Sequence, residues 1–539
     1  MTVRERFLLN GFLCLTAMCC VFFYQWPAFM NVHIIQHDMP LHLSWMVKFA
    51  SPEVFSRDVI ITYAEYLSPL GFKTFYYFLI KCFGYSPWLG KILSVLLFIL
   101  FVSYLFRIGE YFCGCFPGFI MAFYFMIWPR AMDTFAGGNP SAFAYPLLAA
   151  YFYYLLKKDV FKSCIVLILQ LLFYPIAFPI SLITTVIFFI FSLRDKTFFS
   201  KKDIFWIIVF PLGIALLLLC FKSLTKPPFI GDLVNAVDMY SNFEFLDGNR
   251  CDYLPFDSPI ELIKGNLLSH RMFLLFLPVF IIAWITYYRK NDPRLKLCSL
   301  CLALFISGLI LYCLAHVFLF NLHKPQRYLS YNLTLVNVFS LSLAAGFLLD
   351  LLRKTALKIA FTVLVALMAL FLYENILKPV KCKLAADLET VELLEYIKVH
   401  LPEEAIYAAD PFLSDNILMF SERRVFMNDQ FAQPWFKGWY KDFVVPRTIA
   451  FFDAYYSETG NDVLAFCRKN NIGFFVIDKR AFSAEYLHRG MFYFYPLNEK
   501  VRDLVRQRKD FFFLRLKASH ETVFCTRVGN YCIVRMEGK

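Results

Sequence analysis

The residues best suited to chemistry lie just after the first long apolar segment of the chain. The hexapeptide HDMPLH at 37–42 places the Asp38 carboxylate between the imidazoles of His37 and His42, and Asp58 follows in SRDVI. A carboxylate held near a leaving group can act as a general base toward an acceptor hydroxyl, and neighbouring imidazoles can share its proton. Asp38 is therefore the leading candidate for a catalytic carboxylate, followed by His37, His42 and Asp58. The alternative is that all four are ordinary solvated loop residues.

A group of cations lies in a short turn between two later apolar segments. HKPQRY at 323–328 contains Lys324 and Arg327 and ends in Tyr328. Cations in an outer turn depart from the usual charge bias of membrane proteins and need a reason. One reason is a lipid phosphate or pyrophosphate, which arginine binds in a bidentate pair. Snorkelling of the same side chains to lipid headgroups is the competing interpretation.

A third polar segment, WPRAMDTFAGGNPSAFAYP at 128–146, joins two further apolar segments. Arg130 and Asp133 are expected close to the membrane surface, and Asn139 and Tyr328 are kept as additional site candidates. The glycine pair before Asn139 can let the backbone approach a ligand closely, because glycine has no Cβ. A plain turn punctuated by glycine and proline would have the same composition.

The elements that must position these residues are apolar helices. The chain of 539 residues is 59% hydrophobic and 18% charged, with a mean hydropathy of +0.56, whereas soluble domains are about 25% charged. The apolar residues collect in blocks of roughly 18 to 22, the length that crosses a bilayer. We therefore predict a polytopic α-helical membrane protein with about eleven spans. The spans are expected near 8–28, 88–106, 110–128, 141–156, 160–175, 177–193, 204–222, 271–288, 295–317, 330–351 and 357–376.

The charge and cysteine content exclude other classes of protein. The net charge is +13, but the lysines and arginines cluster in short loops and form no nucleic-acid-binding motif, so no nucleic acid partner is expected. Most of the 16 cysteines fall inside predicted spans, where cysteine acts as a small apolar residue. No CxxC pair lies in a polar segment, so neither a metal site nor another cofactor is predicted.

Positive charge also sets the predicted orientation, because lysine and arginine in short loops mark the cytoplasmic side. A span at 69–85 would break the pattern, whereas an interfacial helix there preserves it. The N-terminus of the module 1–376 is then cytoplasmic, and the first loop 29–87, a loop at 223–270 and the tail after 376 lie outside an inner (plasma) membrane. The cytoplasmic turns carry Arg4/Arg6, Arg107, Lys157/Lys158, Arg194/Lys196/Lys201/Lys202, Arg289/Lys290/Arg294/Lys296 and Arg353/Lys354/Lys358.

The tail 377–539 has the pattern of a small extracytoplasmic α/β domain. VELLEYIKVHL and DVLAFCRKNN read as helices, and AIYAAD, RRVFMN and GFFVIDK read as short buried strands, with FFFLRL and YCIVRM as further strands. It contains no GxGxxG, P-loop or nucleophile elbow, so we expect it to cover the membrane site or bind an acceptor. Four cysteines leave a disulfide open, namely Cys382, Cys467, Cys525 and Cys532.

In this arrangement the chain resembles the GT-C superfamily of membrane glycosyltransferases, which includes the protein O-mannosyltransferases and the lipid A aminoarabinose transferase. The resemblance covers the whole chain as architecture. Locally it rests on HDMPLH, SPLGFKTFYYFLIKCFG, FAGGNPSAFAYP, LFYPIAFP and HKPQRY, the last four of which look like segments of uncharacterised bacterial members. The first loop lacks the Asp-Glu pair of the O-mannosyltransferases, which leaves the substrate open.

The resemblance implies transfer of a sugar from a polyprenyl phosphate or diphosphate donor to a lipid, glycan or protein acceptor at the outer membrane face. Asp38 would be the catalytic acid/base, and Arg327 would contact the donor phosphate together with Lys324 or Arg130. Some members use a divalent metal, but a single Asp38 beside two histidines does not define a site for one.

Three other functions fit parts of the pattern. A transporter or lipid flippase predicts an internal repeat and charges at mid-membrane, and the sequence contains neither. A non-enzymatic scaffold predicts dispensable loop residues, and a sugar polymerase or ligase of another fold predicts a different topology. The charges gather at the outer face, which favours chemistry at the interface.

Overall fold

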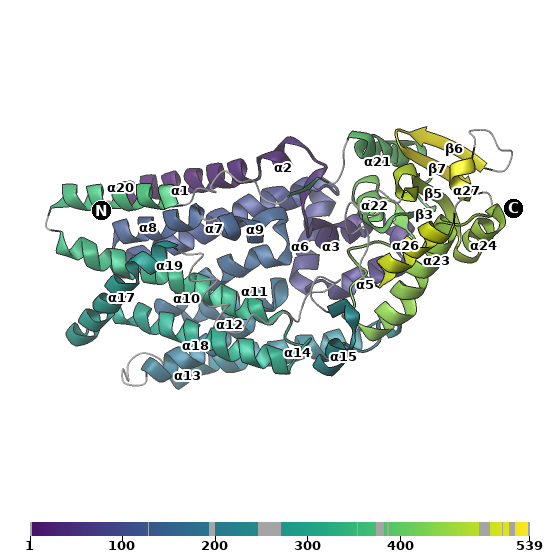
Figure 1. The fold of residues 1–539 in the computed structure, drawn as a ribbon. Helices are drawn as coiled ribbons and strands as arrows, with labels where there is room; N and C mark the ends of the chain where they lie inside the picture. Colours follow the sequence, from purple (N-terminus) through teal and green to yellow (C-terminus); the bar gives the residue numbers. More distant parts are fainter. Residues whose placement is uncertain are drawn as a thin grey trace.

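The computed structural model describes residues 3–127, 129–192, 200–245, 271–352, 354–372, 382–384, 388–483, 496–508, 510–516 and 523–536. Figure 1 shows an elongated molecule, with a helical bundle at one end and a smaller part containing the main sheet at the other. The N-terminus lies at the bundle end and the C-terminus at the sheet end. The connection from α19 to α20 lies at the same end as the N-terminus.

Each predicted span falls on a helix of the bundle. Among the described residues, four helices are long and apolar enough to cross a bilayer by themselves, at Trp88–Cys113, Lys202–Leu224, Leu295–Val317 and Pro325–Leu351. The others are shorter or partly outside the described residues, so the count of about eleven stays a prediction. The bundle helices are α1 (Val3–Tyr24), α7 (Trp88–Cys113), α8 (Cys115–Met126), α10 (Ala144–Leu156), α11 (Val160–Phe173), α12 (Ala177–Ser192), α13 (Lys201–Ile204) continuing through a π-helical turn into α14 (Phe210–Leu224), α17 (Arg271–Lys290), α18 (Leu295–Val317), α19 (Pro325–Leu351) and α20 (Thr355–Leu372).

Helix α19 forms the centre of the bundle, because 83% of its apolar 18-residue stretch is buried. The corresponding stretch of the helix Lys202–Leu224, which contains α14, is only 11% buried. Helices α17, α18 and α8 pack against α19, and α7 packs against α8 and α1. Close approach of α7 and α8 needs glycine, because a Cβ on Gly109 would lie 2.5 Å from the Cα of Gly118. The turn between these helices is at Gly114, so the prediction that Arg107 lies in a turn is wrong and this residue belongs to α7.

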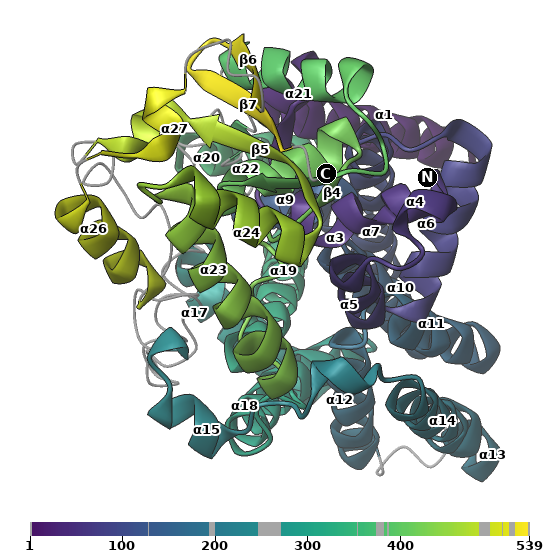
Figure 2. The same ribbon diagram turned by 90° about the vertical axis from the view of Figure 1, so that its right-hand side faces the viewer.

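The first loop folds into short elements between the bundle and the sheet (Figures 1 and 2). An ionic centre holds them together: the Glu65 carboxylate accepts from Lys48 Nζ at 2.6 Å and from Lys73 Nζ at 3.2 Å. These residues come from different elements, so the loop is a packed unit rather than a flexible connection. Its elements are α2 (Trp26–Met30), β1 (Ile34–Gln36), α3 (Met39–Leu43), the 3₁₀ helix η1 (Ser44–Phe49), α4 (Pro52–Phe55), α5 (Val59–Leu67) and α6 (Leu70–Phe83).

Helix α6 corresponds to the segment predicted as an interfacial helix. It has 14 residues, about 21 Å of helix, which is shorter than the roughly 30 Å hydrocarbon layer. Phe72, Tyr76 and Ile80 recur at every fourth position and are buried, while Phe78 and Phe83 are 61% and 73% exposed. In both views α6 runs across the long axis of the bundle (Figures 1 and 2). Its position at the membrane surface stays a prediction.

The C-terminal part is built on a five-stranded sheet in the order β4-β3-β5-β7-β6. Strands β4, β3 and β5 are parallel, and β7 and β6 continue the sheet antiparallel. FFFLRL, predicted as a strand, instead contains the short helix α27; three successive phenylalanines carry no alternation that separates strand from helix. The strands are β3 (Ile406–Ala409), β4 (Arg424–Val425), β5 (Ile472–Asp478), β6 (Val523–Val528) and β7 (Tyr531–Met536), and the longer helices are α21 (Leu388–His400), α23 (Val445–Tyr455), α24 (Gly460–Asn470) and α26 (Leu497–Gln507).

The C-terminal part is tied directly to the first loop. Strand β2 (Cys382–Leu384) pairs antiparallel with β1, and Gln36 is opposite Cys382. The ring of Tyr63 stacks on Trp439 with centroids 3.9 Å apart. A further backbone contact, Val234 N–H to the Trp435 carbonyl at 3.0 Å, joins it to the chain after α14. The residues around β1 are therefore held from both the bundle side and the sheet side.

Candidate active site

Asp38 stands where a helix begins, but its side chain does not cap that helix. It occupies the N-cap of α3 with φ −89° and ψ −3°, and no side-chain capping hydrogen bond is present there. Its backbone N–H donates to Gln36 Oε1 at 2.8 Å. Its carboxylate oxygen Oδ1 lies 3.3 Å from His37 Nδ1, and the side chain is 49% exposed. The carboxylate is thus left available for chemistry while the backbone is fixed.

The charges around Asp38 favour its ionised form. Burial opposes ionisation, but the hydrogen bond from His37 and the electrostatic effects of His42, His37 and Lys324 outweigh it, so the pKa of Asp38 lies below its ordinary value. Burial lowers the pKa of His42 to about 4, against the opposing effect of Asp38, and Arg327 and Lys324 add to the lowering. At neutral pH the pair therefore consists of a carboxylate and a neutral imidazole.

The cations of HKPQRY are placed by the start of α19. Lys324 is the N-cap residue, with a left-handed backbone at φ 51°, and proline follows at the first helical position. Arg327 lies in the first turn, where its Nη1 is 3.3 Å from the hydroxyl of Tyr174. That hydroxyl lies 3.0 Å from the hydroxyl of Tyr331 on α19. Tyr174 belongs to LFYPIAFP, so two separate sequence segments meet at the guanidinium.

The glycine-pair segment contacts the chain on either side of Asp38 in sequence, at Gln36 and Met39, and it also contacts α6. Asn139 Nδ2 donates to Gln36 Oε1 at 3.0 Å, which links the glycine-pair segment to the chain before HDMPLH. The hydroxyl of Tyr76, on α6, donates to the Gly138 carbonyl at 3.0 Å. Gly137 has φ 81°, and a Cβ there would lie 2.4 Å from Cγ of Met39. A residue with a Cβ would clash with Met39 at this position, so residue 137 has to be glycine.

Asp58 has a different set of partners. It is 7% exposed, its carboxylate accepts from the Ile61 N–H at 3.1 Å as the N-cap of α5, and Arg424 Nε lies 3.4 Å from its Oδ2. Both contacts hold structure together: one starts a helix and the other joins the first loop to β4. The structure therefore gives the Asp58 carboxylate a structural role.

The other predicted site residues are less informative. Asp133 is exposed on the short helix α9 (Pro129–Phe135). Tyr328 is buried in α19, where its carbonyl accepts from Asn332 Nδ2. The Arg130 side chain lies outside the described residues.

Two residues near the site were missed by reading the sequence. Gln36 accepts two hydrogen bonds beside Asp38, but a single glutamine in a loop carries no signature. Lys91 is 1% exposed and donates to the carbonyls of Ala28 and Asn31 at 2.6 and 2.9 Å, which fixes the chain reversal before β1. A lysine inside an apolar helix start was a usable signal, because such a charge needs partners.

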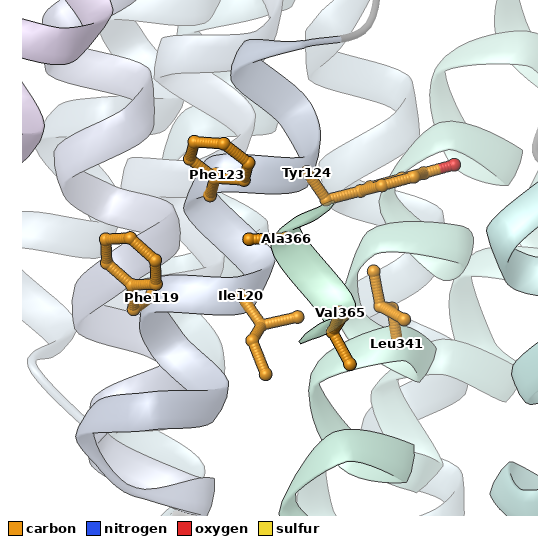
Figure 3. Close-up of a pocket in the computed structure, with 7 residues that line it drawn as sticks. All are labelled: Phe119, Ile120, Phe123, Tyr124, Leu341, Val365 and Ala366. Atoms are coloured by element: carbon orange, nitrogen blue, oxygen red, sulfur yellow. The ribbon is translucent and has the colours of Figure 1, made fainter. Parts of the chain in front are cut away.

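Within the described ranges no group of three or more His, Cys, Asp or Glu side chains is arranged to hold a metal ion. Asp38, His37 and His42 offer one carboxylate and two imidazoles, and metal dependence stays open. Figure 3 shows a pocket of about 10 Å³ between α8, α19 and α20, lined by apolar side chains such as Phe119, Phe123 and Val365. None of its lining residues is a predicted site residue.

Comparison with known proteins identifies the fold. No protein-family model matches the chain, and no curated protein matches it in sequence. The apo oligosaccharyltransferase of Archaeoglobus fulgidus shares its fold, with a TM-score of 0.53, 11% identity, and coverage of 91% of this chain and 72% of that one. AglB from the same organism, in complex with an inhibitory peptide and a dolichol-phosphate, gives 0.53 and 11%, with coverage of 93% and 73%.

ArnT from Cupriavidus metallidurans, bound to undecaprenyl phosphate, matches along almost its full length. The TM-score is 0.51 and the identity 11%, with coverage of 99% of this chain and 98% of ArnT. These neighbours are membrane glycosyltransferases of the GT-C type, and this chain has a GT-C-like fold. The expectation of a GT-C architecture is confirmed at the level of the fold.

Proposed function

We propose that the protein is a membrane glycosyltransferase that moves a sugar from a polyprenyl phosphate or diphosphate donor to an acceptor at the outer face of the membrane. The observation that carries the proposal is that Asp38 lies within electrostatic reach of Lys324, and its neighbour His42 within reach of both Lys324 and Arg327. A carboxylate to take a proton and cations to receive a phosphate are the minimum parts for this transfer. The fold neighbours that bind dolichol-phosphate and undecaprenyl phosphate support the donor class.

The reaction follows from the charges. An acceptor hydroxyl attacks the anomeric carbon of the sugar while Asp38 removes the hydroxyl proton. The bond from that carbon to the phosphate oxygen breaks, and the phosphate leaves with the electron pair. Lys324 and Arg327 stabilise the charge that develops on the leaving phosphate, so no acid has to protonate it. Asp38 is already ionised at neutral pH, which suits it to the role of base rather than acid.

The proposed orientation places the first loop and the C-terminal part outside the membrane. The N-terminus and the α19–α20 connection lie at the opposite end of the bundle from the C-terminal part (Figure 1). Cys532 is disulfide-bonded, as is common in oxidising compartments outside the cytoplasm. The C-terminal part would then present a lipid, glycan or protein acceptor to Asp38.

The test uses the purified protein in vesicles that contain a polyprenyl-phosphate sugar labelled in the sugar, together with a membrane extract as acceptor source. We expect label to move to the acceptor fraction, with release of one polyprenyl phosphate per sugar transferred. A transporter or flippase would instead move the intact labelled lipid between leaflets, and a scaffold would do neither. Either of these results would overturn the proposal.

A further inference from the structure

Gln36 is placed to control the geometry of Asp38 through the Asp38 backbone. Its Oε1 accepts from the Asp38 backbone N–H at 2.8 Å and from Asn139 Nδ2 at 3.0 Å. Its backbone belongs to β1, where it is opposite Cys382 of β2. This one residue thus joins the carboxylate-bearing turn and the segment between α9 and α10 through its side chain, and the strand β2 through its backbone.

The orientation of both amides is fixed by chemistry. The Asp38 backbone N–H is an obligatory donor, so the group of Gln36 that faces it must be the oxygen. The group of Asn139 that faces the same oxygen must then be its NH₂. Asn139 is 2% exposed, so this donor is presented from a buried side chain. Both hydrogen bonds end on the same Gln36 oxygen, so Gln36 links the Asn139 side chain to the backbone of Asp38, and we call this link the relay.

The relay matters because Asp38 does not cap α3. An aspartate at an N-cap commonly bonds the backbone of the following turn, yet here the carboxylate faces His37 instead. Without that cap, the hydrogen bond from the Asp38 backbone to Gln36 is the contact that holds the residue in place on its N-terminal side. Misplacing a catalytic group by about 1 Å can cost roughly 100-fold in rate.

We infer that Gln36, supported by Asn139, is the positioning residue for the catalytic carboxylate. The inference rests on the proposed function, because it assigns Gln36 a role through Asp38.

The first experiment compares Gln36→Met with Gln36→Glu in the transfer assay. Methionine keeps the length of the side chain and removes the acceptor oxygen, so kcat should fall by roughly 10- to 100-fold while KM for the donor stays unchanged. Glutamate keeps an acceptor for both hydrogen bonds but adds a negative charge near an anionic donor. It should retain kcat within about threefold and raise the donor KM.

The second experiment tests the relay by a double-mutant cycle. Asn139→Leu alone should lower kcat by a smaller factor than Gln36→Met, and the double variant should be no worse than Gln36→Met, because both substitutions remove the same path. Gln25→Met is the matched control: this glutamine is also buried near the loop, accepts from Ser94 Oγ at 3.3 Å, and has no bond to Asp38. Its kcat should equal that of the wild type.

A folded Gln36→Met protein with wild-type kcat would overturn the inference, as would Gln36→Glu with a kcat as low as that of Gln36→Met. If Gln36→Met does not fold, Gln36→Glu and Asn139→Leu decide the matter by the same kcat and KM criteria. Failure of the proposed function is separate: it is shown by an Asp38→Asn protein that transfers sugar normally, whatever Gln36 does.

Discussion

Two aspartates of this chain occupy opposite electrostatic environments. Asp38, in the first loop, is half-exposed among cations and imidazoles, which lower its pKa below the ordinary value. Asp410, directly after β3 in the C-terminal part, is raised in pKa to about 7 by burial, with Asp429 and Asp478 adding to the effect. Asp38 is therefore ionised at neutral pH, whereas Asp410 is still partly protonated there.

The difference distinguishes the proposed catalytic carboxylate from carboxylates that stabilise the fold. Asp410 caps α22 (Pro411–Asn416) by accepting from the Phe412 N–H at 3.0 Å, and Asp478 is paired with Arg480 at 2.9 Å. Both carboxylates therefore stabilise the C-terminal part. Asp38 leaves its own helix uncapped, and Lys324 is among the groups that lower its pKa. We therefore expect the neighbours of an acidic residue at a helix start or strand end, rather than its position, to decide whether it is structural or available for catalysis.

The sharpest way to break this comparison is to neutralise Asp38. Asp38→Asn keeps the shape of the side chain and removes its ability to take a proton, so turnover should fall by at least about 100-fold. Asp58→Asn is the matched control, because its carboxylate has structural partners and should keep turnover within about threefold of wild type. Near-wild-type transfer by Asp38→Asn, with a dead Asp58→Asn, would move the catalytic role to Asp58.

Substitution of Arg327 tests whether the cations of the proposed site bind the donor phosphate. Arg327→Ala should raise the donor KM or lower turnover by roughly 10- to 100-fold, the worth of a charged hydrogen bond, and Arg327→Lys should recover only part of it because lysine cannot bind bidentately. The measurement is steady-state transfer against donor concentration. Lys81→Ala, an exposed cation on α6, serves as control, and equal effects of the Arg327 and Lys81 variants would assign Arg327 to headgroup anchoring.

The Asp58–Arg424 pair should affect assembly more than catalysis. Asp58→Asn keeps an N-cap for α5 and loses the ion pair to β4, which we expect to cost about 1–3 kcal/mol of docking stability. Arg424→Gln should have a similar effect, and the double variant should be less destabilised than the sum of the two. Limited proteolysis of the C-terminal part measures this. Additive losses would mean that the two side chains act independently.

The smallest expected effect is a pH dependence at Asp410. Its pKa is higher in the folded protein than the ordinary value of 3.8, so its contribution to stability is complete below about pH 4 and is lost as the pH rises through about 7. Asp410→Asn keeps the cap and removes the titration, so hydrogen exchange of α22 should be less accelerated between pH 5.5 and 8.5 in the variant, after correction for intrinsic rates. An unchanged pH dependence would contradict the raised pKa.

The large features of the fold could be predicted because they depend on local patterns. Apolar blocks of bilayer length located the bundle helices, and the cations that break this pattern separated α6 from the spans. The position of the turn after α7 was missed, because Arg107 reads as a loop cation although the helix continues to Gly114. Local patterning could not show this, since the break depends on a glycine with positive φ.

The site was predictable only in part. Asp38, Lys324 and Arg327 stand out because charged residues next to apolar segments are rare. The structural use of Asp58 could not be foreseen, because its partner Arg424 is distant in sequence and pairs with it only after the C-terminal part has docked. Gln36 was missed because its function comes from the direction of its amide, which residue type alone does not reveal.

The pairing of β1 with β2 also determines when, during synthesis of the chain, the fold around the first loop can be completed. About 350 residues separate Gln36 from Cys382, so at a synthesis rate of about 5–20 residues per second roughly 20–70 s pass before the second strand exists. During that interval the first loop has already left the ribosome without its partner strand. Active protein is then expected only after the tail has crossed the membrane and folded. A growing or truncated chain would be inactive, even though every charged group of the proposed site is already present.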